Sequence, residues 1–385
     1  MKLCLSLRVM RLRLCSLLLW SVCFWSSESE AKPAPKVKCK DVNNNDVDWF
    51  ILYKAPKGQR YMYISTYGKE KINTNIGDPH GVLANTLSPM FDNNMPQSFG
   101  FLSYNDQPPV SKTSDFENLK SGVYGHSKGV VLGDSQTQTA LWLTHSTPRF
   151  PEKRDQQNFW PKTGEANGQT FMCVTLQFSD LEVIGEHLQN IVAHTFDDII
   201  PANFPQEIKD AALNKGQAPD QNPLVQSLKV GNKQLKLVAK VTGQTAKDGD
   251  LYVQLSRIFK SDMEAQTWGR QTRKDKSYCE PNQHQVKSVI EVKTDLDKWT
   301  WCSDHSKWAV TTDNNIHWTC IADMNRAKTQ YERPGGALCI QDQDVKGFFK
   351  VFANKLLECG VDPKNALVTA PLMWSRSLTT FRRWI

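Results

Sequence analysis

The chain has 385 residues, of which 39% are hydrophobic and 23% are charged, and its formal net charge at pH 7 is +7. These proportions are typical of a folded globular protein and exclude a disordered one. The positive excess favours contact with a polyanion such as nucleic acid, although a charge of this size is equally common in proteins that bind none.

The first 30 residues have the pattern of a secretory signal peptide. Basic residues lie between Lys2 and Arg13, an apolar run covers 14–25, and serine and glutamate follow. At about a dozen residues, this run is shorter than the roughly 20 that a membrane-spanning helix needs, and no later stretch reaches that length. We therefore predict a signal peptide at 1–30 and no membrane span; a retained signal anchor is the alternative.

Strand patterns dominate the next part of the chain, which we assign to an N-terminal half at 31–208. Apolar residues that alternate or run on predict strands at 47–53, 61–67, 99–104, 129–132, 140–144 and 171–178. Glycine and proline predict turns at 56–58 and 105–109, and 133–135 is typical of a hairpin turn. A short apolar patch lies at 86–91, and the pattern at 180–193 predicts a helix.

The polar segment 209–232 marks the predicted junction with a C-terminal half at 209–360. Beyond it come the stretches 235–241 and 268–276, predicted helices at 250–259 and 344–358, and predicted strands at 286–292, 307–311 and 318–321. Residues 361–385 are predicted to be an appended, weakly ordered extension. Alternating strands and helices favour α/β layers, and we expect the two halves to share one core.

One motif occurs twice in the chain. A His-Ser-Lys triplet is followed by an aspartate six residues after the lysine, at His126, Lys128 and Asp134 and again at His305, Lys307 and Asp313. On a β-strand, residues two apart point to the same face, so each histidine would project beside its lysine. If the halves pair about a pseudo-twofold axis, both pairs meet in one pocket.

Two imidazoles and two ammonium groups suit phosphate chemistry. A histidine can attack phosphorus, a lysine can neutralise charge on the non-bridging oxygens, and a second histidine can protonate the leaving oxygen. This chemistry requires no metal ion. The alternative is two unrelated triplets, but the shared serine, the shared aspartate and the tryptophans that follow, Trp142 and Trp318, favour a duplication.

Longer runs surround the two triplets. The first half contains Asp48-Trp49-Phe50, Tyr104-Asn105-Asp106-Gln107-Pro108-Pro109, Gly125-His126-Ser127-Lys128-Gly129 and Trp142-Leu143-x-His145-Ser146-x-Pro148. The second half contains Asp304-His305-Ser306-Lys307-Trp308, Trp318-Thr319-Cys320-x-x-Asp323-Met324-Asn325-Arg326 and Gly335-Gly336-x-Leu338-Cys339. From about residue 39 to 359, these runs resemble the acid deoxyribonuclease (deoxyribonuclease II) family.

The resemblance implies a phospholipase-D-like α/β fold, in which two similar halves related by a pseudo-twofold axis form one shared active site. It also implies a metal-independent endonuclease, without a cofactor, that cleaves DNA at acid pH through a phosphohistidine and leaves 3′-phosphate and 5′-hydroxyl ends. The implied role is degradation of DNA from dead or engulfed cells. The expected location is the secretory pathway, lysosomal in the first place and secreted as the alternative, although no Asn-x-Ser/Thr sequon is present.

On this resemblance the reaction centre consists of His126, Lys128, His305 and Lys307. His305 is the position that the family identifies most firmly as essential, but either histidine could be the nucleophile. His145 and Asn325 follow the two motif histidines by 19 and 20 residues, so they are candidate phosphate-side donors, with a buried structural role as an equal alternative. The motif aspartates, Asp134 and Asp313, are further candidates for a supporting role.

Seven cysteines remain after residue 30, which allows up to three disulfides and one odd thiol in an oxidising compartment. The absence of a Cys-x-x-Cys spacing disfavours a zinc site. The resemblance implies the pairs Cys39 with Cys173, Cys279 with Cys359, and Cys320 with Cys339. It leaves Cys302 unpaired.

Two other functions compete with a DNA endonuclease. A phospholipase or another phosphodiesterase would share the fold class, but the Gly-Ser-x-Asn tail usual in the lipid enzymes is missing. A basic, non-catalytic or toxin-like nucleic-acid-binding protein would bind without needing either histidine. The sequence leaves the oligomeric state open.

Because two neighbouring histidines can titrate separately beside lysines, we expect the activity to have a moderately acidic pH optimum.

Overall fold

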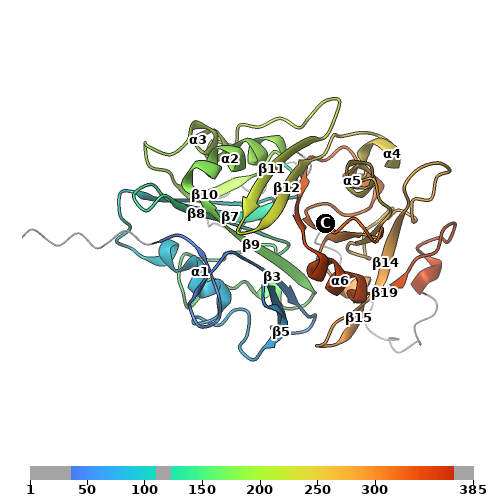
Figure 1. Ribbon diagram of the computed structural model, residues 1–385, viewed down its shortest axis with the longest axis horizontal. Coiled ribbons are helices and arrows are strands. Elements are labelled where there is room, and N and C mark those ends of the chain that lie inside the picture. Colours follow the sequence, from blue (N-terminus) through green and yellow to red (C-terminus); the bar gives the residue numbers. More distant parts are fainter. Residues whose placement is uncertain (1–35, 110–122, 368–385) are drawn as a thin grey trace, which may run out of the picture. The chain divides into compact units, whose positions relative to one another are not determined.

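The computed structural model describes residues 36–109 and 123–367 (Figure 1). The predicted signal peptide at 1–30 and the end of the predicted extension, 368–385, lie outside the described residues. Within them, no helix is long and apolar enough to cross a bilayer.

The described chain is a mixed α/β structure with two large sheets. The first sheet has the order β10-β6-β7-β8-β9-β3-β4-β5, and all its neighbouring strands are antiparallel. Its strands are β3 Trp49–Lys54, β4 Tyr61–Ser65, β5 Gly68–Ile72, β6 Phe99–Asn105, β7 Lys128–Asp134, β8 Thr139–His145, β9 Gln169–Gln177 and β10 Thr195–Ile199. A separate two-stranded sheet pairs β1 Cys39–Lys40 with β2 Asp46–Val47.

The second large sheet has the order β11-β12-β18-β17-β16-β13-β14-β15, and β19 also pairs with β14. Its strands are β11 Leu224–Val230, β12 Lys233–Ala239, β13 Met263–Gln266, β14 Val286–Lys293, β15 Lys298–Thr300, β16 Trp308–Thr311, β17 Trp318–Ala322, β18 Gly336–Gln341 and β19 Ala353–Leu356. β13 and β14 are parallel, whereas the other pairs are antiparallel.

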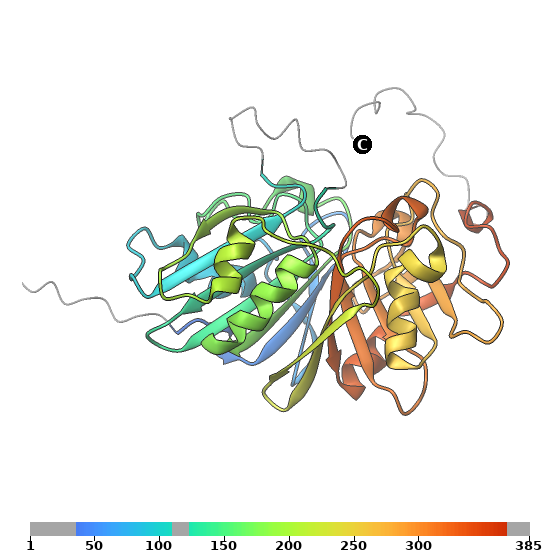
Figure 2. The same cartoon turned by 90° about the horizontal axis from the view of Figure 1, so that it is seen from above.

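The α-helices are α1 Val82–Phe91, α2 Leu181–Asn190, α3 Gln206–Ala212, α4 Ala246–Gly249, α5 Leu251–Phe259 and α6 Gln343–Phe352. Aspartates cap two of them: Asp250 accepts from the N–H of Tyr252 (2.8 Å) before α5, and Asp342 accepts from the N–H of Val345 (2.9 Å) before α6. Short 3-10 helices cover Lys162–Gly164, Phe178–Asp180, Trp301–Ser303, Lys328–Gln330 and Asn365–Leu367. In Figure 2, α2 and α3 lie side by side in green.

The hydrophobic core explains why the central strands are apolar on both faces. Every residue of β3 is buried, because one face packs with α1 and the other faces a core shared by both large sheets. That shared core contains Trp49 and Trp142 from the first sheet and Leu237 and Trp308 from the second. A third cluster packs α5 on the outer face of the second sheet. The expectation of one core shared by the two halves agrees with this arrangement.

Three disulfides link cysteines within the described residues. They join Cys39 to Cys173, Cys279 to Cys359, and Cys320 to Cys339, the pairs that the family resemblance implied. The last pair links facing residues of β17 and β18. Cys302 is a free, half-buried thiol.

Most predicted elements are confirmed, including the β7–β8 hairpin and helices near 180–193 and 250–259. One prediction was wrong. The helix predicted at 344–358 ends at Phe352, because the following residues pair with β14 as β19. The polar segment 209–232 holds the end of α3 and all of β11, whose polar residues suit the exposed edge of a sheet. Its assignment as the junction between the halves stays a prediction. The apolar patch at 86–91 is the last part of α1.

Candidate active site

The two His-Ser-Lys triplets lie where a loop enters a central strand of each sheet. Lys128 is the first residue of β7, and Lys307 directly precedes β16. The histidines therefore sit in the loops, not in the strands, so the alternation expected of strand residues does not by itself orient them.

Each histidine backbone is anchored to the other half of the chain. The N–H of His126 donates to the carbonyl of Pro334, just before β18, at 3.2 Å. The N–H of His305 donates to the carbonyl of Gly168, just before β9, at 2.9 Å. These contacts hold each triplet loop against a loop of the other sheet.

Side chains from the two triplets lie within electrostatic range of one another. Burial, followed by the positive charges of Lys307, Lys128 and His126, holds the pKa of His305 well below its usual range. Burial and the charge of Lys128 likewise lower the pKa of Lys307 to about 7. The structure therefore brings the four residues of the predicted reaction centre together.

The side chain of the first histidine, His126, lies beside the carboxylate of Asp106. Asp106, in the loop after β6, forms ion pairs with Lys128 and with Arg333, whose Nη2 lies 2.9 Å from Oδ2. Nδ1 of His126 lies 3.1 Å from Oδ2 of Asp106 and 2.7 Å from Nη1 of Arg333. Burial opposes ionisation of Asp106, but its contacts with Lys128, His126 and Arg333 hold its pKa well below the usual value. Burial and the charges of Lys128 and Arg333 outweigh Asp106 and lower the pKa of His126 to about 3.

The second histidine has different surroundings. Its ring packs edge-on against Trp268, with ring centroids 4.2 Å apart. Its carbonyl accepts from Nζ of Lys307 at 2.8 Å. Its Nε2 is buried and has no hydrogen-bond partner among the described residues, which leaves that lone pair or proton available to a substrate.

A buried network behind His305 fixes the loop. The carboxylate of Asp304 accepts from the hydroxyl of Tyr53 at 2.7 Å, from Nε1 of Trp299 at 2.6 Å and from the N–H of Ser306 at 2.9 Å. Nε1 of Trp308 donates to the same Tyr53 hydroxyl at 3.1 Å. Because Tyr53 belongs to β3 of the first sheet, this network also crosses between the halves.

A second carboxylate lies near both lysines. Asp323, just after β17, is buried, and its Oδ2 accepts from the N–H of Gly336 at 3.0 Å. Burial raises its pKa to about 7, although that hydrogen bond and the charges of Lys128 and Lys307 act in the opposite direction. Asp323 therefore changes charge near neutral pH.

The structure connects the two candidate phosphate-side donors to the site in different ways. His145, at the end of β8, is buried with Nε2 unpartnered among the described residues, and its Nδ1 accepts from the N–H of Thr147 at 3.2 Å. Burial and the nearby charge of Lys128 keep its pKa well below the usual value. Asn325 reaches the site indirectly, because its Oδ1 accepts from the N–H of Trp268 at 3.3 Å.

The motif aspartates are not brought to the site. Asp134 ends β7, roughly 20 Å along the strand from Lys128. There it accepts from the N–H groups of Gln136 (3.0 Å) and Thr137 (2.7 Å) and stabilises the hairpin turn. Asp313 is exposed beyond the end of β16, where its carboxylate accepts from the N–H of Asn315 at 2.8 Å. Both contacts account for aspartate in a turn.

Four residues near the histidines were not predicted as site residues: Asp106, Trp268, Asp323 and Arg333. Asp106 was interpreted only as part of a turn and of the family resemblance, and Asp323 only as part of the resemblance. Their position in the sequence could have indicated them, because each directly follows a strand that pairs with β7 or β16, the strands that follow the two histidines. Trp268 and Arg333 lie in loops from distant parts of the chain, and no sequence pattern connects them to the triplets.

Comparisons with known proteins show the family to which the chain belongs. A family model described as Deoxyribonuclease II matches residues 38–359. Plancitoxin-1 of Acanthaster planci is 34% identical over 342 residues, covering 81% of this chain and 90% of that protein. Deoxyribonuclease-2-alpha of Rattus norvegicus is 31% identical over 85% of this chain and 95% of its own. Cell-death-related nuclease 7 of Caenorhabditis elegans is 29% identical over 90% and 93%, respectively. The chain belongs to the deoxyribonuclease II family.

Proposed function

We propose that this protein is an acid endodeoxyribonuclease that hydrolyses DNA phosphodiester bonds to 3′-phosphate and 5′-hydroxyl ends. The observation that carries the proposal is that His126 and Lys128, from one part of the chain, lie close enough to lower the pKa of His305, from a distant part, and that Lys128 also lowers the pKa of Lys307. Membership of the deoxyribonuclease II family supports DNA as the substrate.

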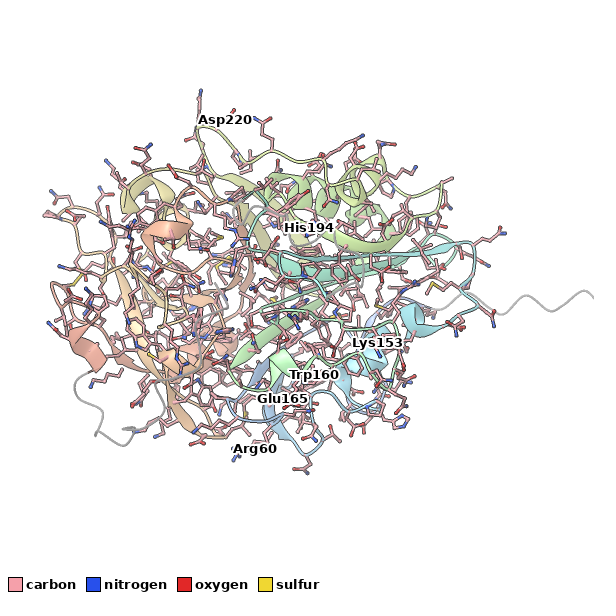
Figure 3. All side chains as sticks on the ribbon, turned by 180° about the vertical axis from the view of Figure 1, so that it is seen from behind. Arg60, Lys153, Trp160, Glu165, His194 and Asp220 are labelled. Atoms are coloured by element: carbon pink, nitrogen blue, oxygen red, sulfur yellow. A yellow bond between two sulfur atoms is a disulfide. The ribbon has the colours of Figure 1, made fainter. Side chains whose placement is uncertain are left out.

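The proposed architecture is phospholipase-D-like, with similar halves at 31–208 and 209–360 related by a pseudo-twofold axis. Matched lysines support it. Lys54, at the end of β3, is fully buried, and its Nζ donates to the next carbonyl (2.6 Å) and to that of Glu165 (3.1 Å; labelled in Figure 3). Lys240, just after β12, is equally buried and donates to its own next carbonyl (3.1 Å) and to that of Tyr331 (2.6 Å). Glu165 and Tyr331 each stand three residues before the carbonyl that anchors a triplet histidine.

In the proposed reaction one histidine attacks phosphorus to form a phosphohistidine, and the other protonates the 5′-oxygen that leaves. The ammonium groups of Lys128 and Lys307 neutralise the non-bridging oxygens as charge develops there. His145 and Asn325 are proposed to complete the phosphate surroundings, His145 through its unpartnered Nε2 and Asn325 by holding the Trp268 loop.

The proposed acid optimum follows from two groups that titrate near pH 7. As the pH falls through this range, Lys307 becomes charged and Asp323 becomes neutral, because their pKa values both lie at about 7. The site thus gains positive charge in acid, which favours an anionic phosphate.

We also propose that the enzyme needs no metal ion. The described residues contain no group of three or more His, Cys, Asp or Glu side chains arranged to hold one. The proposed place of action is the lysosome, or the cell exterior as the alternative, where the enzyme would degrade DNA from dead or engulfed cells. Three disulfides suit an oxidising compartment.

A plasmid-nicking assay at about pH 5 in EDTA tests this function. The wild-type protein is expected to convert supercoiled DNA to nicked and linear forms, and His305→Ala is expected to lose at least about 100-fold in rate while its thermal unfolding is unchanged. Exposed His80→Ala is the matched control and should retain activity. Cleavage by folded His305→Ala at the wild-type rate, or a strict requirement for a divalent cation, would contradict the proposal.

A further inference from the structure

Nδ1 of His126 has two neighbours, one of which requires it to accept a hydrogen bond and the other to donate one. Nη1 of Arg333 lies 2.7 Å away and Oδ2 of Asp106 lies 3.1 Å away. A guanidinium only donates hydrogen bonds and an ionised carboxylate only accepts them. The contact with Arg333 therefore requires a lone pair on Nδ1, whereas the contact with Asp106 requires a proton there. The ring cannot satisfy both at once.

Arg333 is held firmly in this position. Its Nε donates to the carbonyl of Tyr124 at 3.0 Å, and its Nη2 donates to Asp106 at 2.9 Å. Only 14% of its side chain is exposed. Arg333 reaches the first histidine from the loop before β18, so a residue of the C-terminal half contacts His126 of the N-terminal half.

The second triplet lacks this arrangement. Asn105 pairs with Lys128 across β6 and β7, so Asp106 is the next residue outward. In the second sheet Gln266 pairs with Trp308, which is one residue past the triplet lysine. The residue that corresponds to Asp106 therefore lies two positions after Gln266 and is Trp268. An indole ring thus stands beside His305 where a carboxylate stands beside His126.

Because their neighbours differ, the two histidines suit different roles in the reaction. A general acid must hold an extra proton, which a neighbouring carboxylate stabilises. A nucleophile must be neutral with a free lone pair, which an indole and nearby cations favour. The charged groups facing His126 are Asp106, Lys128 and Arg333, with the second imidazole of His305 opposite.

We propose that Arg333 is a positioning residue that competes with Asp106 for Nδ1 of His126 and so sets the pH range in which His126 serves as the general acid, with His305 as the nucleophile. This inference rests on the proposed function. While Arg333 donates to Nδ1, the ring is neutral and cannot deliver a proton. Once the ring is protonated, Nδ1–H turns to Asp106 and Nε2–H is ready for the leaving oxygen.

The Nε2 lone pair of His305 forms a bond to phosphorus, the bond from phosphorus to the 5′-oxygen breaks, and that oxygen takes the proton from Nε2 of His126. Neutral His126 then takes a proton from water as the hydroxyl oxygen attacks phosphorus. The phosphorus–nitrogen bond breaks, its electrons return to His305, and the 3′-phosphate leaves.

A DNA duplex with one 5′-bridging phosphorothiolate linkage tests the assignment of roles. Its leaving thiolate needs no proton, so a missing general acid matters little at that bond. On ordinary DNA, His126→Ala and His305→Ala should each lose at least about 100-fold in rate. At the phosphorothiolate, His126→Ala should come within about 10-fold of the wild type, whereas His305→Ala should stay inactive. Rescue of His305→Ala instead would overturn the assignment, and activity of His305→Ala on both substrates would overturn the proposed function itself.

The pH dependence of kcat tests the role of Arg333. In Arg333→Gln the alkaline limb on ordinary DNA should move up by about one pH unit, because Nδ1 is left to Asp106 alone. Arg333→Lys, which keeps a donor, should shift it less. At the phosphorothiolate the shift should disappear. The control is Arg60→Gln, at an exposed arginine labelled in Figure 3 that pairs at 4.0 Å with Asp297 and should leave the profile unchanged.

Folding must be monitored in the same variants. Arg333→Gln and Arg333→Lys are compared by thermal unfolding, and kcat is measured well below the lower midpoint. An alkaline limb that stays in place in both folded variants, or that moves to lower pH, would refute the role of Arg333.

Discussion

At the scale of single residues, Asp323 is expected to limit activity at neutral pH. Its pKa of about 7 means that the side chain is neutral in acid and ionised above neutrality, where it repels a phosphate. In Asp323→Asn, the KM for DNA at pH 7.5 should fall about threefold to tenfold relative to the wild type, with little change at pH 5. Steady-state assays at both pH values measure this, and an equal effect at both would contradict it.

Asp323 also links stability to pH. Its folded pKa of about 7 lies above the ordinary 3.8, so its stabilising contribution is complete below about pH 4 and is lost as the pH rises through 7. Asparagine keeps an acceptor for the N–H of Gly336 but does not titrate. The free energy of unfolding of Asp323→Asn should therefore decline less between pH 4 and 7 than that of the wild type, as urea titrations at each pH would reveal. Parallel declines would exclude this linkage.

Tyr53 is expected to stabilise the loop of His305. Tyr53→Phe leaves the buried Nε1 of Trp308 without its partner and removes one donor from Asp304. We expect a loss of roughly 1–3 kcal/mol in the free energy of unfolding, together with lower activity. Tyr67→Phe, at a tyrosine that is 94% exposed, is the control and should change stability by less than about 0.5 kcal/mol. Equal stability of the two variants would argue against a role for the network.

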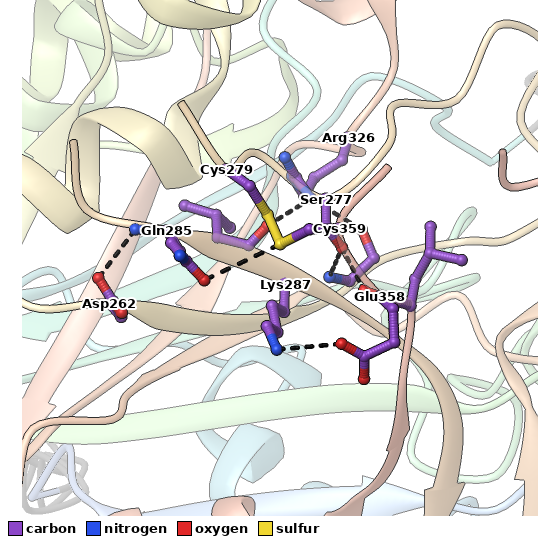
Figure 4. The surroundings of a disulfide bond; sticks show 11 residues. Asp262, Ser277, Cys279, Gln285, Lys287, Arg326, Glu358 and Cys359 are labelled. Carbon is purple, nitrogen blue, oxygen red and sulfur yellow. Dashed lines mark hydrogen bonds and ion pairs between the residues drawn. A yellow bond between two sulfur atoms is a disulfide. The ribbon is translucent and has the colours of Figure 1, made fainter. Parts of the chain in front are cut away.

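At the scale of elements, the Cys279–Cys359 disulfide ties the chain after β19 back to the second sheet. Around it, Lys287 forms an ion pair with Glu358 at 3.3 Å, and the N–H of Gln285 donates to Asp262 at 2.8 Å (Figure 4). The bridge spans 80 residues, so replacing both cysteines with alanine should cost about 4 kcal/mol of stability.

Thermal unfolding and DNA cleavage at 20 °C separate the effects of this double replacement. Because both cysteines lie outside the candidate active site, activity should persist while the unfolding midpoint drops. Cys302→Ser changes a free thiol and serves as the control, with little expected effect. An unchanged midpoint in the double variant would contradict a stabilising role for the bridge.

Sequence patterns predicted the elements whose side chains repeat at the period of a strand or helix, such as β7, β8 and α5. They missed β11 and β19, which lie beside other strands but carry polar or half-exposed residues. A strand of that kind is stabilised by its partner through backbone hydrogen bonds, so its own composition gives little signal.

At the scale of the whole molecule, the duplicated triplets predicted which four side chains the structure brings together, because the residue types and their spacing are repeated. They could not predict Arg333 or Trp268, which reach the histidines through packing between distant loops. The same packing breaks the similarity of the two triplets, since Asp106 and Trp268 occupy corresponding positions. The repeated motif therefore marks the candidate active site, whereas the unrepeated neighbours give the two histidines different surroundings.

The proposed function requires a single reaction centre to which both halves contribute. The most direct test compares cleavage of DNA at about pH 5 by His126→Ala, His305→Ala and the double variant. Groups that act in one site are not additive, so each single variant should fall to nearly the same residual rate as the double variant. If each single variant instead kept about half of the wild-type rate and only the double variant were inactive, the halves would carry separate sites and the account would be contradicted.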